Sequence, residues 1–298
     1  MEDAKSVYSA LRPRTLFVSA SPVLLTISLL YKSHHVSFLQ FDVFTILICA
    51  LLAQLIGNLS VVYNNFQRTL QPSKITEVPD VKIILNLLTL TQIRRWSTLF
   101  YGLQLTLFGL THGIYGKSIQ ITGAMVSLVT LILIYCQRKD KLLRVIGLRE
   151  AMIAWGVGPI AMFSTSVYLV GELPWAIVMY AYIVMLLAWA YLLLESARDA
   201  PFARRMGCAD TSLALHLGFQ YCFQGFLLLM VSFYGLVLVI GIAMGHLGNF
   251  LLVVTIVKLK DISEDLRLER LILLPDQFAR LAAVLSVGLI FSILAGLT

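Results

Sequence analysis

Two carboxylates at the end of an apolar stretch are the residues whose types and spacing best suit chemistry. Glu195 and Asp199 stand four residues apart, just after the apolar segment 174–194. Residues at that spacing share one face of a helix, so both carboxylates would point the same way. Such a pair can hold Mg²⁺, which takes one or two carboxylates together with substrate phosphates. The alternative is structural: Glu195 pairs with Arg198, or Asp199 pairs with an arginine of the following loop.

A second polar group stands near the end of another apolar segment. Asn58, Val62 and Asn65 follow one another at spacings of four and three, which places them on one helix face. A polar residue inside a membrane helix is expensive and therefore marks a candidate functional site. The alternative for Asn58 and Ser60 is structural, because such side chains also join neighbouring helices through hydrogen bonds.

The elements that must position these residues are apolar helices. Hydrophobic residues make up 59% and charged residues 13% of the 298, against about 25% charged in a typical soluble domain. The apolar runs are unbroken and near the ~20 residues that a helix needs to cross a bilayer, unlike the alternating strands of a membrane barrel. We therefore expect an all-α, polytopic membrane protein in which one transmembrane domain, 1–298, holds nine helices. The expected spans are 15–31, 42–64, 97–115, 119–136, 150–170, 174–194, 217–240, 243–257 and 278–297.

The basic residues indicate how these helices are oriented. With a cytoplasmic N-terminus, every one of the 23 Lys and Arg residues except Lys32 and Lys117 falls on the cytoplasmic side, as the positive-inside rule requires. The cytoplasmic loops would then be 65–96, 137–149, 198–216 and 258–277. The net charge of +7 is thus a signal of topology, and we expect no nucleic-acid partner. The pattern fits an integral protein of a bacterial inner membrane.

Several short motifs occur in a fixed order along the whole chain. They are 11–16 (Leu-Arg-Pro-Arg-Thr-Leu), 21–25 (Ser-Pro-Val-Leu-Leu), Asn58-Leu59 with Tyr63, 91–95 (Thr-Gln-Ile-Arg-Arg), 147–150 (Gly-Leu-Arg-Glu) with Gly158-Pro159, Arg198-Asp199 with Arg204 and Gly207, and 215–218 (Leu-His-Leu-Gly). This ordered set resembles the UbiA superfamily of intramembrane prenyltransferases. The 1,4-dihydroxy-2-naphthoate polyprenyltransferases of menaquinone synthesis are the branch that it resembles most.

The resemblance implies a helical bundle around a lipid-open central cavity. Its cytoplasmic end would bind Mg²⁺ and an isoprenoid diphosphate, and the allylic carbon would alkylate an aromatic or quinone-type acceptor. The implied catalytic residues are Asp199, Asn58 and Asn65, and the implied metal ligands are Asp199 and Glu195. The implied substrate-binding residues are Arg94, Arg95, Arg198, Arg204, Arg205, Tyr63 and Tyr135.

The Asp-rich motifs of this chain depart from the pattern of that branch. The first motif there reads approximately N-x-x-x-D-x-x-D, whereas Asn58 is followed here by Val62 and Asn65. In the second motif the later Asp is replaced by Ala203. A neutral Asn is a poor substitute for Asp, because it offers one carbonyl oxygen and no charge.

Three functional hypotheses remain open from the sequence. The chain is an active prenyltransferase with a drifted magnesium site, acting on an isoprenoid diphosphate and an aromatic acceptor. Alternatively, it is a non-catalytic relative that binds a prenyl lipid or quinone, or that serves as an accessory subunit for a protein partner. The third reading is a transporter, which should show broken helices at matching positions of two halves. A Gly-Pro pair inside an apolar segment occurs only once, at Gly158-Pro159.

Overall fold

The computed structural model describes residues 16–69, 89–115, 147–205 and 213–296, and every element within these ranges is helical. The elements in chain order are α2 (Leu16–His34), α3 (Phe41–Thr69), α5 (Leu90–Tyr115), α7 (Leu148–Trp155), η4 (Gly156–Ile160), α8 (Ala161–Val170), α9 (Trp175–Arg205), α10 (Leu213–Leu217), α11 (Phe219–Ala243), η5 (Leu247–Thr255), α12 (Ile256–Arg267) and α13 (Leu274–Ala295). The all-α prediction is confirmed for this part of the chain.

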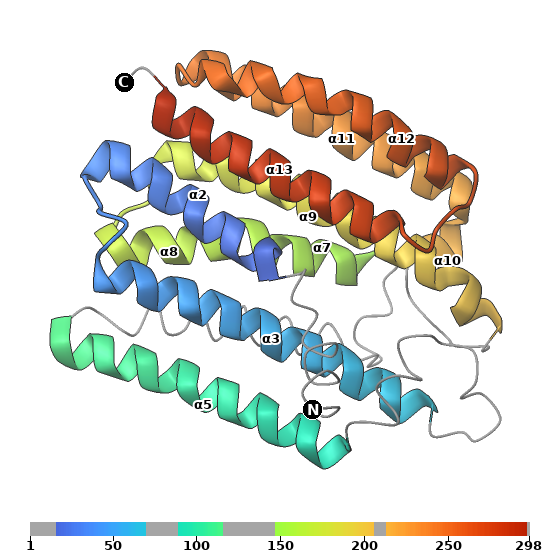
Figure 1. Cartoon of the computed structure of the whole chain (residues 1–298), viewed down its shortest axis with the longest axis horizontal. Helices are drawn as coiled ribbons and strands as arrows, with labels where there is room; N and C mark the ends of the chain where they lie inside the picture. The colour runs from blue at the N-terminus through green and yellow to red at the C-terminus, as the bar shows by residue number, and fades with distance from the viewer. Residues whose placement is uncertain (1–15, 70–88, 116–146, 206–212, 297–298) are drawn as a thin grey trace.

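The long helices lie side by side in one bundle with alternating directions (Figure 1). Helix α5 packs on α3 at one edge, and α11 with α12 forms the opposite edge. Between these edges, α9 packs against α11, α13 and the α7–α8 segment, so it runs through the middle of the bundle. Fully buried aromatic rings fill the interior, and Phe226 of α11 meets Phe278 of α13 edge to face at 5.5 Å.

Six of the described helical segments are long and apolar enough to cross a membrane. They are Leu16–His34, Phe41–Ser60, Glu150–Val170, Trp175–Pro201, Phe219–Ala243 and Leu274–Ala295. This set supports an integral membrane protein, although it does not bring the count to nine. The expected span 119–136 lies outside the described residues, and the expected span 97–115 lies in α5, which is not among the six.

The predicted boundaries around the eighth span differ from the structure. A transmembrane segment was expected at 243–257 and a loop at 258–277, but η5 leads directly into α12, which continues to Arg267. Lys258 pairs with Asp261 at 3.0 Å and Lys260 with Glu264 at 3.9 Å. Ion pairs three and four residues apart support a helix whatever its polarity, so the polar composition of 258–267 did not mark a loop.

A proline inside a helix usually kinks or breaks it, but the structure holds the Gly158-Pro159 pair in a π-helical turn. This turn, η4, joins α7 and α8 without a gap, and the Ala161 N–H reaches back to the Gly156 carbonyl. A Cβ on Gly158 would lie 2.7 Å from Met185 N and 2.9 Å from Ala181 O. The glycine therefore lets η4 rest directly on the backbone of α9.

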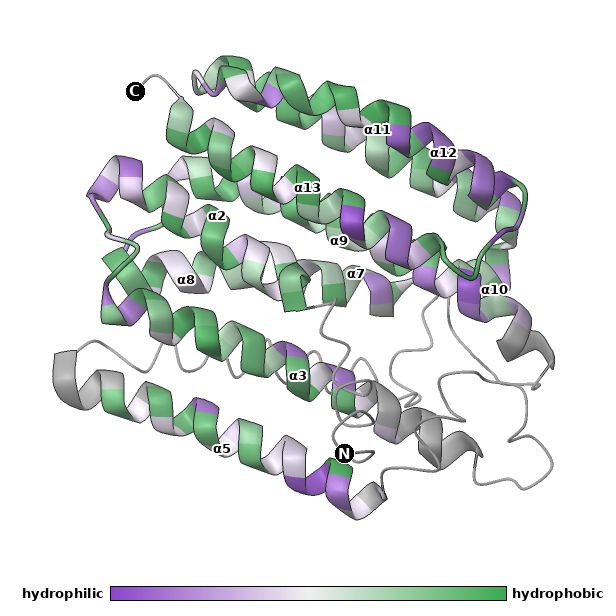
Figure 2. Ribbon diagram, viewed as in Figure 1, coloured by the Kyte–Doolittle hydropathy of each residue, from purple (hydrophilic) through white to green (hydrophobic). Residues whose placement is uncertain are grey.

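Hydrophilic residues gather at one end of the bundle. Figure 2 shows them at the ends of α12 and α13 that meet in the connecting loop, whereas apolar residues dominate along the helices. The same end holds the C-terminal part of α9 (Figure 1). The two carboxylates of the sequence analysis therefore lie where the apolar bundle meets its polar end.

Candidate functional site

Four side chains on successive turns of α9 form a polar group, which we call the α9 cluster: Tyr191, Glu195, Arg198 and Asp199. The Tyr191 hydroxyl donates to Glu195 Oε1 at 3.0 Å. Arg198 Nε donates to Asp199 Oδ1 at 2.8 Å, and Arg198 Nη2 lies 4.0 Å from Glu195 Oε1. The pairing between Glu195 and Arg198, left open by the sequence, is therefore present, and a single arginine serves both carboxylates.

These contacts bear on the predicted magnesium site. Among the residues that the structure describes, no group of three or more His, Cys, Asp or Glu side chains could hold a metal ion. Arg198 stands against both carboxylates, and a cation between them would have to displace it. The Asn65 side chain lies outside the described residues. The described donors do not fit a two-magnesium centre.

Asn58 belongs to a different chain of hydrogen bonds. It is 5% exposed, and its Oδ1 accepts a hydrogen bond from Gln54 Nε2 at 3.0 Å. Gln54 Oε1 in turn accepts from the Ser19 hydroxyl at 2.6 Å. The bond that joins α3 to α2 is therefore made by Gln54, and the bond between Gln54 and Asn58 lies within α3. The analysis of the sequence missed Gln54, although its spacing of four from Asn58 was a usable signal.

A cavity of about 260 Å³ begins beside the α9 cluster. Residues of α2, η4, α9 and α13 line it, and most of them are apolar. Tyr191 belongs both to its wall and to the α9 cluster, so the hydrogen-bonded Glu195 lies next to the apolar space. The other polar residues of the wall are Ser21, Asp276, Arg280 and Ser286. The arrangement suits an amphiphile with an apolar chain and a polar head.

Asp276 and Arg280 are site residues that sequence reasoning missed. They stand four apart near the start of α13, where both line the larger cavity. The predicted span began at residue 278, so Asp276 was assigned to a loop and the shared face went unnoticed. Arg280 is exposed on this wall. Its guanidinium therefore remains available to an anion.

The predicted substrate-binding arginines of α5 do not line either cavity. Arg94 and Arg95 are exposed in the first turns of this helix. The adjoining Gln92 has a structural role, because Thr89 N donates to Gln92 Oε1 at 2.8 Å and Gln92 N to Thr89 Oγ1 at 3.2 Å. These two bonds form a capping box that starts α5.

Several other predicted positions are described only in part. Tyr63 is half-buried in α3. The side chains of Arg204 and Arg205, together with the whole of Tyr135, lie outside the described residues. Their predicted roles in substrate binding stay predictions.

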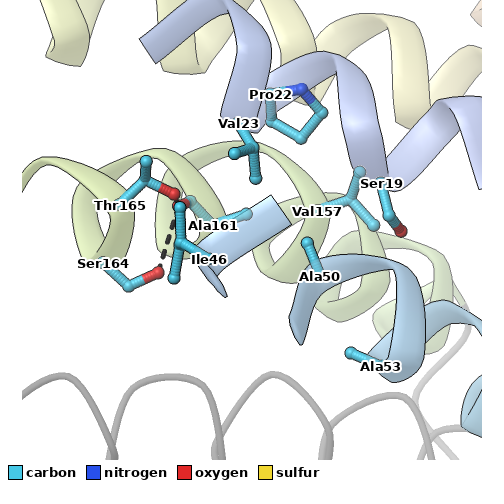
Figure 3. A pocket seen from close by; sticks show the side chains of 10 residues that line it. All are labelled: Ser19, Pro22, Val23, Ile46, Ala50, Ala53, Val157, Ala161, Ser164 and Thr165. Atoms are coloured by element: carbon cyan, nitrogen blue, oxygen red, sulfur yellow. Dashed lines mark hydrogen bonds between the residues drawn. The ribbon is translucent and has the colours of Figure 1, made fainter. Parts of the chain in front are cut away.

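A second, smaller cavity of about 40 Å³ lies between α2, α3, η4 and α8. Figure 3 shows side chains from these elements converging on it, with Ala50 and Ala53 on one side and Val157 and Ala161 on another. Val157, which is 6% exposed, also lines the larger cavity.

Glu150 is a further buried acidic residue, in the first turn of α7. It is 3% exposed, and its Oε2 atom has no hydrogen-bond partner among the described residues. It lies outside the walls of both cavities. The sequence marked it only as part of the 147–150 motif.

Comparison with known proteins gives a match in structure and none in sequence. The chain matches no protein-family model and no curated protein sequence. A UbiA homologue from Aeropyrum pernix K1 is similar in structure, with a TM-score of 0.66 and 15% identity over 93% of this chain and 97% of that one. A UbiA homologue from Archaeoglobus fulgidus bound to GPP and Mg²⁺ gives 0.63 and 12% over 97% and 99%. A digeranylgeranylglyceryl phosphate synthase gives 0.60 and 14% over 99% of both chains. The chain therefore has the fold of the UbiA homologues over nearly its whole length.

Proposed function

We propose that this chain is an intramembrane prenyltransferase that transfers an isoprenoid group from its diphosphate to an aromatic or quinone-type acceptor. The observation that carries the proposal is the apolar cavity of about 260 Å³ that begins at the α9 cluster. The fold supports it, because a homologue of the same fold holds GPP with Mg²⁺. A bacterial inner membrane and the menaquinone branch belong to the same proposal.

The proposed reaction exchanges one bond for another at the allylic carbon. The C–O bond to the diphosphate breaks, and the diphosphate leaves with the electron pair. A carbon of the acceptor ring forms the new C–C bond and then loses its proton. Arg198 would stabilise the charge on the leaving diphosphate, since guanidinium groups match phosphate oxygens in geometry and charge. Arg280, on the cavity wall, would supply a second positive charge.

Magnesium enters no step of this proposed reaction. The homologue holds Mg²⁺ with its GPP, but the described donors of this chain place Arg198 against the two carboxylates that would bind a metal. The positive charge next to the carboxylates is therefore the arginine itself. Glu195 and Asp199 would hold this guanidinium in place for the diphosphate.

The test is diphosphate binding and transfer by the full chain in nanodiscs. Calorimetry with geranyl and geranylgeranyl diphosphate should give binding in EDTA, and a labelled donor should prenylate at least one member of a panel of aromatic acceptors. Arg198→Ala should weaken this binding at least tenfold, as expected when one partner of a charge-assisted contact is removed. Arg94→Ala is the matched control, because Arg94 is exposed on α5 and lines neither cavity.

A second candidate function is the binding of an uncharged prenyl lipid or quinone without catalysis, with or without a partner protein. The observation that favours it is the charge of the α9 cluster, in which one arginine serves two carboxylates and the remaining negative charge disfavours a diphosphate. Binding of prenylated quinones or isoprenols in nanodiscs, with no binding of diphosphates and no transfer, would select this function over the enzyme.

A further inference from the structure

Val157 is the one residue that the walls of the two cavities share. The larger cavity lies on the side of α2 that carries Phe17, Val18 and Ser21 and faces α9 and α13. The smaller cavity lies on the side that carries Pro22 and Val23 and faces α3 and α8. The two spaces therefore meet different sides of α2, and both of them border the Val157 side chain.

The π turn fixes the position of this side chain. Val157 belongs to η4, and its neighbour Gly158 rests on the α9 backbone with no room for a Cβ. The helix cannot approach α9 more closely, nor can it shift by a residue without losing this contact. Interiors are packed closely enough that one side chain can keep two spaces apart.

The smaller cavity could accept an apolar chain end. Its three hydroxyl groups already have partners: Ser164 Oγ donates to Ile160 O at 2.7 Å, Thr165 Oγ1 to Ala161 O at 2.7 Å, and Ser19 Oγ to Gln54 Oε1 at 2.6 Å. A hydrocarbon that enters this cavity would therefore leave all three hydroxyl groups hydrogen-bonded. The remaining wall is alanine, valine, isoleucine and proline.

We propose that Val157 sets the length of the isoprenoid chain that the protein accepts, by closing the larger cavity off from the smaller one. The inference rests on the proposed function for the chemistry of the occupant, an isoprenoid. Shortening Val157 joins the two spaces and lets the chain end run past η4 into the space between α3 and α8. The wild-type protein thus favours a shorter isoprenoid than the joined cavities would hold.

The experiment compares Val157→Ala with Val184→Ala in the full chain in nanodiscs. Val184 is the matched control, because it is also a buried valine and lines the larger cavity alone. Dissociation constants are measured for geranyl, farnesyl and geranylgeranyl diphosphate and for the three corresponding isoprenols. Val157→Ala should shift the preference toward the longer chain about tenfold, since one methylene group in an apolar pocket is worth ten-fold or more. Val184→Ala should leave the ratio of long-chain to short-chain affinity unchanged.

A second substitution that refills the space controls for an indirect effect of Val157→Ala. Ala50 lines only the smaller cavity, on α3. Adding Ala50→Leu to Val157→Ala should fill the newly joined space and return the ratio to the wild-type value. Size-exclusion profiles and melting curves without ligand identify any variant that has lost its fold, and Val157→Thr, which keeps the branched shape, should retain the wild-type ratio.

The outcomes separate this inference from the proposed function. If Val157→Ala leaves the ratio of long-chain to short-chain affinity unchanged, or if Val184→Ala changes it equally, Val157 does not set the chain length. Diphosphate binding by the wild type would still support the proposed function. If no diphosphate binds but Val157→Ala shifts the ratio for the isoprenols, the role of Val157 is supported and the proposed prenyltransferase activity is rejected. Absence of binding by every isoprenoid with either head group rejects both.

Discussion

Arg198 lies between two carboxylates of its own helix, and its removal is expected to create a metal site. Without the guanidinium, Glu195 and Asp199 would be two like charges one turn apart, and a divalent cation would relieve their repulsion. Arg198→Ala should therefore bind Mg²⁺ or Mn²⁺ at least tenfold more tightly than the wild type, as measured by calorimetry.

The control for this gain is the triple variant Glu195→Ala, Arg198→Ala, Asp199→Ala, which should lose it. Wild-type protein that already binds Mg²⁺ as tightly as Arg198→Ala would contradict the assignment of the arginine to the metal position. The two results test the contacts of 2.8 and 4.0 Å that Arg198 makes with Asp199 and Glu195.

Gln54 is expected to contribute to stability through the bonds that it makes on both sides. Gln54→Leu removes the acceptor of Ser19 and the donor to Asn58, which is 5% exposed. The loss of two such hydrogen bonds costs about 1–3 kcal/mol, and it should appear as a lower midpoint in denaturant titration. Thr106→Val is the control: its hydroxyl bonds only to Gly102 O on the exposed face of α5, so the midpoint should hardly move.

The sequence predicted part of the site for reasons that are local. Glu195, Arg198 and Asp199 are neighbours on one helix, so their spacing alone predicted which side chains meet. Asp276 and Arg280 contribute to the same cavity from a helix far along the chain, and no local spacing connects them to Glu195. The cavity itself depends on how α2, η4, α9 and α13 pack, which the residue pattern of no single segment contains.

Two glycines give a test at the level of the helices. Gly158→Ala would place a Cβ 2.7 Å from Met185 N, and a backbone atom of a packed helix cannot move aside. We expect a loss of about 1–3 kcal/mol, as for other overpacked interiors. Gly235 of α11 has nothing within 4 Å of the added Cβ, so Gly235→Ala should instead be neutral or stabilising by up to about 1 kcal/mol. Thermal or denaturant unfolding in the same detergent measures the change in unfolding free energy of each variant. Equal losses in the two variants would contradict the close approach of η4 to α9.

Prediction from sequence succeeded for the helices whose membrane-spanning stretch is a clean apolar run. Trp175–Pro201 and Phe219–Ala243 are of this kind, and both were predicted nearly at their observed starts. Prediction failed where ion pairs or packing, and not hydropathy, determine the helical structure. Residues 258–267 are helical because of ion pairs and three buried apolar residues, Leu259, Ile262 and Leu266. The π turn at 156–160 follows from packing on α9, which hydropathy does not register.

At the scale of the whole molecule, the end of the bundle opposite the α9 cluster is held by a buried histidine. His246, which is 8% exposed, meets the Tyr180 hydroxyl at 2.6 Å through Nδ1, and its carbonyl accepts from Ser292 Oγ at 3.1 Å. Asn249 Nδ2 reaches the same Tyr180 oxygen at 3.4 Å, and Lys32 Nζ donates to Gly296 O. These bonds join α2, α9, η5 and α13.

Burial lowers the pKa of His246 below its usual value, and the positive charge of Lys32 lowers it further. The folded protein therefore binds a proton here less readily than the unfolded chain does. The stabilisation is complete above about pH 6.5 and is lost as the pH falls through the lowered pKa. Wild-type protein should melt at a lower temperature at about pH 5 than at about pH 7.5, and His246→Gln should lose most of that difference. An identical pH dependence in the variant would assign the effect to other groups.

The π turn also restricts how the length of this chain can vary among its relatives. A π turn accommodates one residue more than an α-helical turn, so η4 is equivalent to a single inserted residue. Each residue advances an α-helix by about 100° around its axis. Deleting one residue from Gly156–Ile160 would close this turn to a regular α-helical turn, so α7 and α8 would keep the faces that they bury now, whereas a deletion from α7 or α8 would turn a buried face by about 100°. Between the positive-φ glycines Gly147 and Gly171, single-residue deletions among relatives should therefore fall at Gly156–Ile160 and not in α7 or α8.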